Sequence, residues 1–168
     1  MNLKDIKGQY DAVFSLGHLC LAAIQLRNND LRPFAGPLDW VTTNSLSDLN
    51  RLLRNRFTGF MNSKNIRVIG YNTGEKKEEG STIYVLVDFY NIGSVHDFDA
   101  DQNTLDQLIT YSEVMEKYNR RINRFLEKVS TGNRILFVRT EGEGSFKEAQ
   151  ELELVLSDLV QHDFSVLL

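Results

Sequence analysis

Residues 12–16 form an almost continuous apolar run, Ala-Val-Phe-Ser-Leu, that ends at Gly17. Such a run is typical of a strand covered on both faces, as strands are in a parallel sheet. A helical pattern follows from about His18 to Asn29. Its predicted inward face consists of Leu19, Ala22, Ala23 and Leu26. This order of strand, glycine and helix favours an α/β fold.

Strand and helix patterns alternate along the rest of the chain. Runs rich in β-branched and aromatic residues predict strands at 66–71 and 82–89, which could pair as a hairpin, and at 134–139 and 164–168. Helices are predicted after Ser45 and over 104–130 and 146–161, with Phe146 facing inward. Residues 90–102 and 141–144 are expected to be loops.

Together these patterns indicate a single α/β domain over residues 1–168. We expect a mainly parallel central sheet, built from 10–16, 134–139 and 164–168, with helices on both faces and right-handed connections. The last predicted strand runs to Leu168 without a polar tail, which raises the possibility of a truncated C-terminus.

The composition limits the classes of function. With 168 residues and a net charge of −4, the chain gives no reason to expect nucleic acid or an anionic membrane as partner. No apolar run approaches the ~20 residues that span a bilayer, and residues 1–11 lack the apolar core of a signal peptide. One cysteine cannot form an internal disulfide, so a reducing cytoplasm is the simplest compartment. The oligomeric state cannot be read from the sequence.

No metal or other cofactor is expected. One cysteine excludes a zinc site built from three or four cysteines. Asp97, Asp99 and Asp101 alternate as some calcium ligands do, but the sixth and twelfth positions of that pattern hold Gln102 and Leu108 instead of Gly and Glu. Neither a Walker loop nor a dinucleotide fingerprint is present.

Cys20 is the only cysteine, and it lies in the first turn of the predicted helix. Unpaired backbone N–H groups and the helix dipole favour a thiolate there, so we expect a lowered thiol pKa and a nucleophilic role. The simpler alternative is a buried small apolar residue. Position alone favours this alternative, but the strand–glycine–helix context shifts the balance toward the nucleophile, because ligands of open α/β sheets bind beyond the carboxyl ends of strands.

Three histidines could act as the base. His96 follows the strongest predicted strand and is our choice, with Asp97 or Asp39 to orient its ring. The alternative is a solvent-exposed loop with an acidic patch. His18 could line the same cleft, together with Gly17 and Trp40, whereas His162 is expected to contact the end of the last helix.

A basic stripe runs along the predicted helix 104–130, and its members include Lys117, Arg121 and Arg124. This stripe could hold an anionic ligand. A solvated helix face is the simpler alternative.

Several blocks of sequence resemble a bacterial family described as putative papain-like cysteine peptidases. They are Ser15-Leu16-Gly17-x-x-Cys20, Gly36-Pro37-Leu38-Asp39-Trp40, His96-Asp97-Phe98, Lys117-Tyr118-x-Arg120-Arg121-Ile122-x-Arg124-Phe125 and Ile135-Leu136-Phe137-Val138-Arg139. The family's usual second block reads P-F-D-W, and Leu38 replaces its Phe here. The resemblance covers residues 10–139.

The resemblance implies Cys20 as nucleophile, His96 as general base and Asp97 or Asp39 as orienting acid. The order of cysteine before histidine agrees with papain-like enzymes. Papain-like folds place the cysteine helix against an antiparallel sheet, whereas the residue patterns predict mainly parallel strands around it.

Two functions follow. In the first, the protein is a cysteine hydrolase or acyltransferase acting on a peptide, amide or ester, and backbone N–H groups near residues 18–20 stabilise the oxyanion. In the second, it is a non-catalytic α/β module that holds an anionic ligand or partner on the face of Lys117, Arg121 and Arg124.

Overall fold

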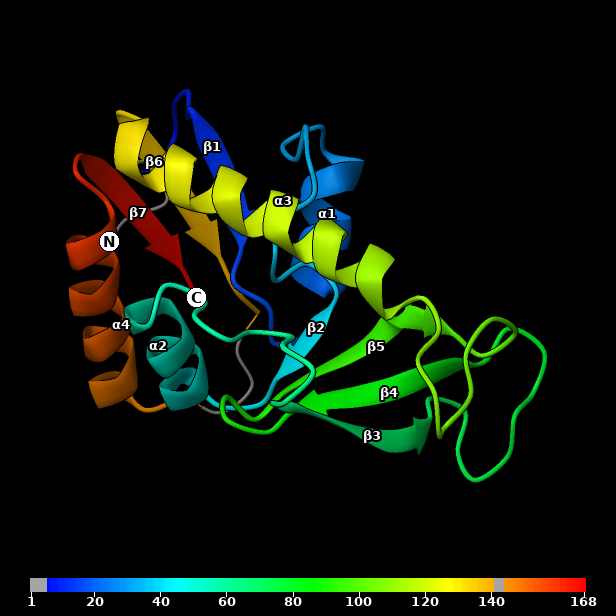
Figure 1. Cartoon of the computed structure of the whole chain (residues 1–168). Helices are drawn as coiled ribbons and strands as arrows, with labels where there is room; N and C mark the ends of the chain where they lie inside the picture. Colours follow the sequence, from blue (N-terminus) through cyan, green and yellow to red (C-terminus); the bar gives the residue numbers. More distant parts are fainter. Residues whose placement is uncertain (1–5, 141–143) are drawn as a thin grey trace.

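The computed structural model describes residues 6–140 and 144–168. In these residues seven strands form two sheets, one parallel and one antiparallel, and four helices pack around them (Figure 1). The predicted α/β class is confirmed. The parallel sheet and the antiparallel sheet lie at opposite ends of the molecule, and helix α3 (Tyr111–Thr131) runs across both.

The parallel sheet has the order β1-β6-β7, with β1 at Ala12–Ser15, β6 at Arg134–Val138 and β7 at Asp163–Leu167. These are the three strands that the sequence predicts for a parallel sheet. Helix α1 (Leu21–Asn28) covers one face, where Leu26 packs with Val13 and Leu136. Helix α3 covers the other face together with α4 (Phe146–Leu159).

The antiparallel sheet has the order β2-β5-β4-β3. Its strands are β2 (Val41–Thr43), β5 (Ile92–Asp99), β4 (Thr82–Val87) and β3 (Ile66–Tyr71). The predicted hairpin is confirmed as β3 and β4, which pair from Ile66 with Val87 to Tyr71 with Ile83. Helix α2 (Leu46–Arg54) packs beside α4 at the junction of the sheets.

Several predicted boundaries are wrong. Residues 90–102 are not a loop, because Ile92–Asp99 form β5. The long helix begins at Tyr111 and not at residue 104, and α1 begins at Leu21 and not at His18. The predicted loop at 141–144 falls largely on residues 141–143, which lie outside the described residues.

Two side chains predicted to face inward are exposed. Leu19 is 50% exposed because it lies in the turn before α1, and Phe146 is 78% exposed at the first position of α4. Both predictions extended a helical stripe one turn too far toward the N-terminus. Phe146 directly follows the N-cap residue Ser145. The Ser145 hydroxyl accepts a hydrogen bond from the amide of Glu148, and the Glu148 carboxylate accepts one from the amide of Ser145.

One core runs through both sheets. Phe14 of the parallel sheet packs on Phe125 of α3 with ring centres 4.7 Å apart, and the same cluster includes Ile83 and Val85 of the antiparallel sheet. Arg139, 2% exposed, also links the sheets: its guanidinium donates to the carbonyls of Leu16 at 3.0 Å and Thr43 at 2.8 Å. The end of β1 is therefore fixed to the end of β2.

Candidate active site

The turn between β1 and α1 is built from two residues with positive φ. Gly17 has φ +77°, and His18 has φ 75°, a conformation that is costly for a residue with a side chain. Thr43 holds this turn, because its Oγ1 accepts the His18 amide at 2.7 Å and its own amide donates to the His18 carbonyl at 3.2 Å. Cys20 then caps α1 from the end of this fixed turn.

A bulge in β5 presents His96 to the same region. Ile83 pairs with Phe98, but Val85 pairs with Ser94, so residues 95–97 lie opposite the single residue Tyr84. A bulge bends a strand and redirects its side chains, and bulges are common beside active sites. Here the imidazole of His96 is exposed, while the next side chain, Asp97, points into the protein.

Cys20 and His96 meet across the two sheets. The Sγ of Cys20 lies 3.3 Å from the Nε2 of His96, although the residues are 76 positions apart in sequence. Trp40 packs edge-on against the imidazole with ring centres 6.0 Å apart. If the thiol is the donor of this hydrogen bond, the neutral imidazole carries its proton on Nδ1. A half-buried thiol and an exposed ring leave the pair open to a reactant.

Asp97 does not hydrogen-bond to His96 in this structure. Its carboxylate accepts hydrogen bonds from Ser94 Oγ at 2.5 Å and Tyr118 OH at 2.5 Å, and it also pairs with Lys117. Burial raises the pKa of this carboxyl, but the donors from Lys117, Ser94 and Tyr118 outweigh burial and hold the pKa below its ordinary value. The bulge carries His96, and Asp97 anchors this bulge to helix α3.

Asp39 does not contact His96 either. Its side chain is 1% exposed, pairs with Arg32 and accepts the amide of Gly36 at 2.8 Å. Burial raises the pKa of this carboxyl, and the Gly36 amide and Arg32 offset only part of the effect. Arg32 also lies against Trp40, with its guanidinium carbon 5.6 Å from the indole centre. Asp39 and Arg32 therefore support the wall of the site below Trp40.

The expected lowering of the Cys20 pKa is wrong. Burial raises the pKa of the thiol; its own backbone N–H acts in the opposite direction, and the negative charge of Asp39 raises the pKa further. The helix terminus is present as predicted, but burial outweighs it. The resting pair is therefore a neutral thiol beside an imidazole, and nucleophilic attack requires the base.

Two backbone amides remain for an oxyanion. The sequence analysis proposed the amides of residues 18–20, but the His18 amide is already bound to Thr43. Within the described parts of the chain, no other residue accepts a hydrogen bond from the amides of Leu19 or Cys20. Leu19 precedes α1 and Cys20 is its N-cap residue, so neither amide has a partner within the helix.

A cleft of about 320 Å³ opens beside His96. Its lining residues are Trp40, His96, Asp97, Lys117 and Arg121. Arg124, expected on the same face, is exposed and lies over the ring of Phe34 at 5.1 Å. Two cations of the predicted stripe, Lys117 and Arg121, line this cleft, and Arg124 does not. Lys117 is paired with Asp97, whereas Arg121 has no ionic partner among the described residues.

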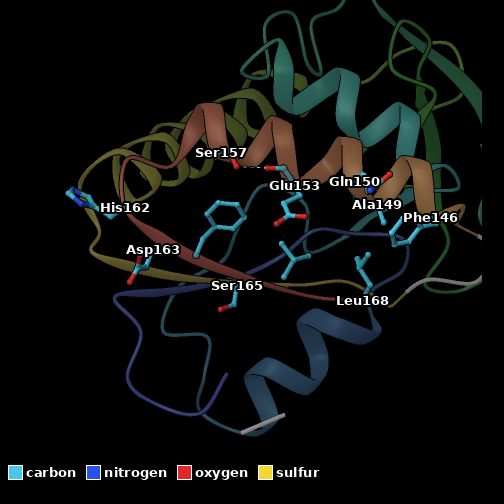
Figure 2. A pocket seen from close by; sticks show the side chains of 11 residues that line it. Phe146, Ala149, Gln150, Glu153, Ser157, His162, Asp163, Ser165 and Leu168 are labelled. Atoms are coloured by element: carbon cyan, nitrogen blue, oxygen red, sulfur yellow. Dashed lines mark hydrogen bonds between the residues drawn. The ribbon is translucent and has the colours of Figure 1, made fainter. Parts of the chain in front are cut away.

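Another cavity, of about 540 Å³, lies away from this pair in the fold. It is a groove between α4 and the edge strand β7, lined partly by Phe146 and Leu168 (Figure 2). His162 stands at its outer end and points away from it (Figure 2). Because β7 and β1 are opposite edges of the parallel sheet, the groove does not reach Cys20.

Sequence reasoning missed three residues of the site. Thr43 fixes the turn before Cys20, Ser94 fixes Asp97, and Arg139 fixes Thr43. A charged residue directly after an apolar strand is the sequence signal that could have identified Arg139; Thr43 has no comparable signal. Within residues 6–140 and 144–168, no group of three or more histidine, cysteine or acidic side chains could hold a metal ion. The helices described there are all too short or too polar to cross a bilayer.

Comparisons with known proteins support the family that the sequence resembles. A family model described as "Putative papain-like cysteine peptidase (DUF1796)" matches residues 11–168. Uncharacterized protein R408 of Acanthamoeba polyphaga mimivirus is 26% identical over 159 residues, which are 89% of this chain and 71% of that protein. No solved structure matches.

Proposed function

Because the chain belongs to the family described as putative papain-like cysteine peptidases, we propose that it is a cysteine hydrolase or acyltransferase with Cys20 as nucleophile and His96 as base. Its substrate is a peptide, amide or ester. The observation that carries the proposal is the distance of 3.3 Å between Sγ and Nε2, which is within reach for proton transfer.

The chemistry needs only groups of this site. As Sγ attacks the carbonyl carbon, its proton passes to Nε2 of His96 and the carbonyl oxygen becomes an oxyanion. The amides of Leu19 and Cys20 are the donors placed to stabilise that oxyanion. The imidazolium returns the proton to the leaving amine or alcohol as the tetrahedral intermediate collapses to a thioester. Water, or another nucleophile, then cleaves the thioester with His96 again as base.

Burial of the thiol makes the base essential. A thiolate formed in advance would attack without help, but the raised pKa of Cys20 leaves little thiolate near neutral pH. Trp40 limits the motion of the imidazole from one side, and Asp97 anchors the bulge beneath it. In this proposal Asp97 and Asp39 are positioning residues, since neither contacts the reacting atoms.

Thiol alkylation tests nucleophile and base together. With iodoacetamide at pH 7, we expect His96→Ala to label roughly tenfold more slowly than the unchanged protein, because proton removal is lost. His162→Ala, a matched change far from the pair, should label at the unchanged rate. The rate should rise with pH to a midpoint at or above the ordinary thiol value of about 8.5, since burial favours the protonated form.

Acyl transfer is tested with p-nitrophenyl acetate. Mass spectrometry should find an acetyl group on Cys20 in the unchanged protein, none in Cys20→Ala and much less in His96→Ala. Equal labelling and acetylation of His96→Ala and the unchanged protein would leave Cys20 an ordinary thiol and favour the non-catalytic module.

A further inference from the structure

Arg121 is a cation without an ionic partner at the wall of the active-site cleft. It lies one helical turn beyond Lys117 on α3, on the same face of the helix. Lys117 forms an ion pair with Asp97, and Arg32 forms one with Asp39. The positive charge of each of these two residues is therefore balanced by a carboxylate. Among the described residues, Arg121 makes no hydrogen bond or ion pair, and its Nη1 is buried without a partner.

Buried donors without partners are rare in proteins and indicate a missing acceptor. The charge of Arg121 acts against the raised pKa of Asp39, but the two side chains form no ion pair, and Asp39 Oδ1 is itself buried without a partner. Arg121 otherwise contacts the face of Tyr118, with its guanidinium carbon 5.9 Å from the ring centre. A planar guanidinium with five donors is best suited to a carboxylate, which it can bind through two oxygens.

The cleft places such a carboxylate near the reacting atoms. Arg121 and His96 line the same space of about 320 Å³, and Trp40 forms its apolar wall. His96 is in turn 3.3 Å from the sulfur. A group bound to Arg121 would therefore belong to the part of the substrate that lies on the imidazole side of the scissile bond.

We propose that Arg121 makes the Cys20–His96 site selective for substrates that carry a carboxylate next to the scissile bond. The carboxylate can come from an acidic side chain or from the C-terminus of a peptide. This inference rests on the proposed cysteine chemistry for its biological meaning. Its test, however, measures directly how strongly the cleft attracts a negatively charged reagent. Arg121 is assigned as a specificity residue and not as a catalytic one.

The test compares two alkylating reagents of similar shape. Iodoacetate carries a carboxylate where iodoacetamide carries a neutral amide. In both reactions the sulfur forms a bond to the methylene carbon, iodide leaves and the thiol proton passes to His96 and from there to solvent. Because Cys20 is the only cysteine, the extent of modification reports on this site alone. The measured quantity is the ratio of the iodoacetate rate to the iodoacetamide rate.

We expect Arg121→Gln to lower this ratio roughly three- to fivefold, the effect of removing a partly exposed ion pair. Arg121→Lys should keep most of the ratio, because it keeps the charge. Arg120→Gln, the same change on the exposed neighbouring position of α3, should leave the ratio unaltered. High salt should lower the ratio of the unchanged protein but not that of Arg121→Gln.

An unchanged ratio in folded Arg121→Gln would overturn the inference and assign Arg121 to neutralising Asp39. If Arg121→Gln unfolds, the salt dependence of the unchanged protein decides: a ratio that does not respond to salt also overturns it. The ratio is measurable even for a slowly reacting thiol. A failure of the cysteine chemistry would instead appear as equal rates in His96→Ala and the unchanged protein, so the two failures are distinguishable.

Discussion

At the scale of single residues, the His96 side chain is exposed and that of Asp97 is buried, and this decides what each can do. The exposed imidazole reaches Cys20, while the carboxylate reaches Lys117, Ser94 and Tyr118. Cys20 and His96 could be chosen from the sequence because a nucleophile and a base are rare residue types in this chain. The contacts of Asp97 could not be predicted, since they depend on the local path of the strand.

Replacement of Asp97 by Asn tests its anchoring role. Loss of charged hydrogen bonds should lower the free energy of unfolding at pH 7 by about 2 kcal/mol, measured by urea denaturation, and should slow Cys20 alkylation. The folded-state pKa of Asp97 is depressed, so its contribution is complete above the ordinary carboxyl pKa and is lost as pH falls through the folded value. The stability difference between the two proteins should therefore shrink below about pH 4. A difference that is constant with pH would contradict this role.

At the scale of elements, two irregular backbone segments form the site: the turn after β1 and the bulge in β5. The sequence predicts the first, because Gly17 marks the turn between strand and helix. The sequence does not predict the bulge in β5, because a bulge breaks the alternation of inward and outward residues by which a strand is recognised. For that reason residues 90–102 are predicted as a loop, and the choice of His96 rests on that prediction; the imidazole instead reaches Cys20 from strand β5.

Thr43→Val should disturb the turn after β1 selectively. The valine keeps the shape of threonine but removes the acceptor of the His18 amide, which then lies unpaired. We expect a loss of about 1–2 kcal/mol in the free energy of unfolding and slower alkylation of Cys20 by iodoacetamide. Thr42→Val is the matched control, since Thr42 is only half-buried and its hydroxyl makes one weak contact with the Gly93 carbonyl at 3.4 Å. Equal effects of the two changes would show that the turn does not depend on Thr43.

At the scale of the whole molecule, the sequence predicts the parallel sheet and the β3–β4 hairpin, because buried strands and neighbouring strands leave local patterns. It does not predict that β2 and β5 join the hairpin as a second sheet. Val41 pairs with Ser94 across more than fifty residues, and no local periodicity records such a pairing. The Cys20–His96 pair is a consequence of how the two sheets are joined, so its distance could only come from the structure.

Arg139→Met tests that junction. The change removes donors to the carbonyls of Leu16 and Thr43, which lie at the ends of strands from different sheets. We expect the free energy of unfolding to fall by about 3 kcal/mol. We also expect Cys20 to be alkylated by iodoacetamide no faster than in His96→Ala, so that the rate advantage given by His96 is lost. Arg134→Met, at the opposite end of β6, should cost less and keep that advantage. A stable Arg139→Met protein with unchanged alkylation kinetics would refute this account.

The strand order also fixes when the site can exist during protein synthesis. Among the described strands β1 pairs with β6 alone, so the strand that leads to Cys20 has no sheet partner until residues 134–138 have left the ribosome. By then His96 has long been translated and its hairpin can already have formed. We therefore expect the thiol to reach its imidazole only after most of the chain has been translated, so that a shorter nascent chain carries Cys20 and His96 as separate side chains.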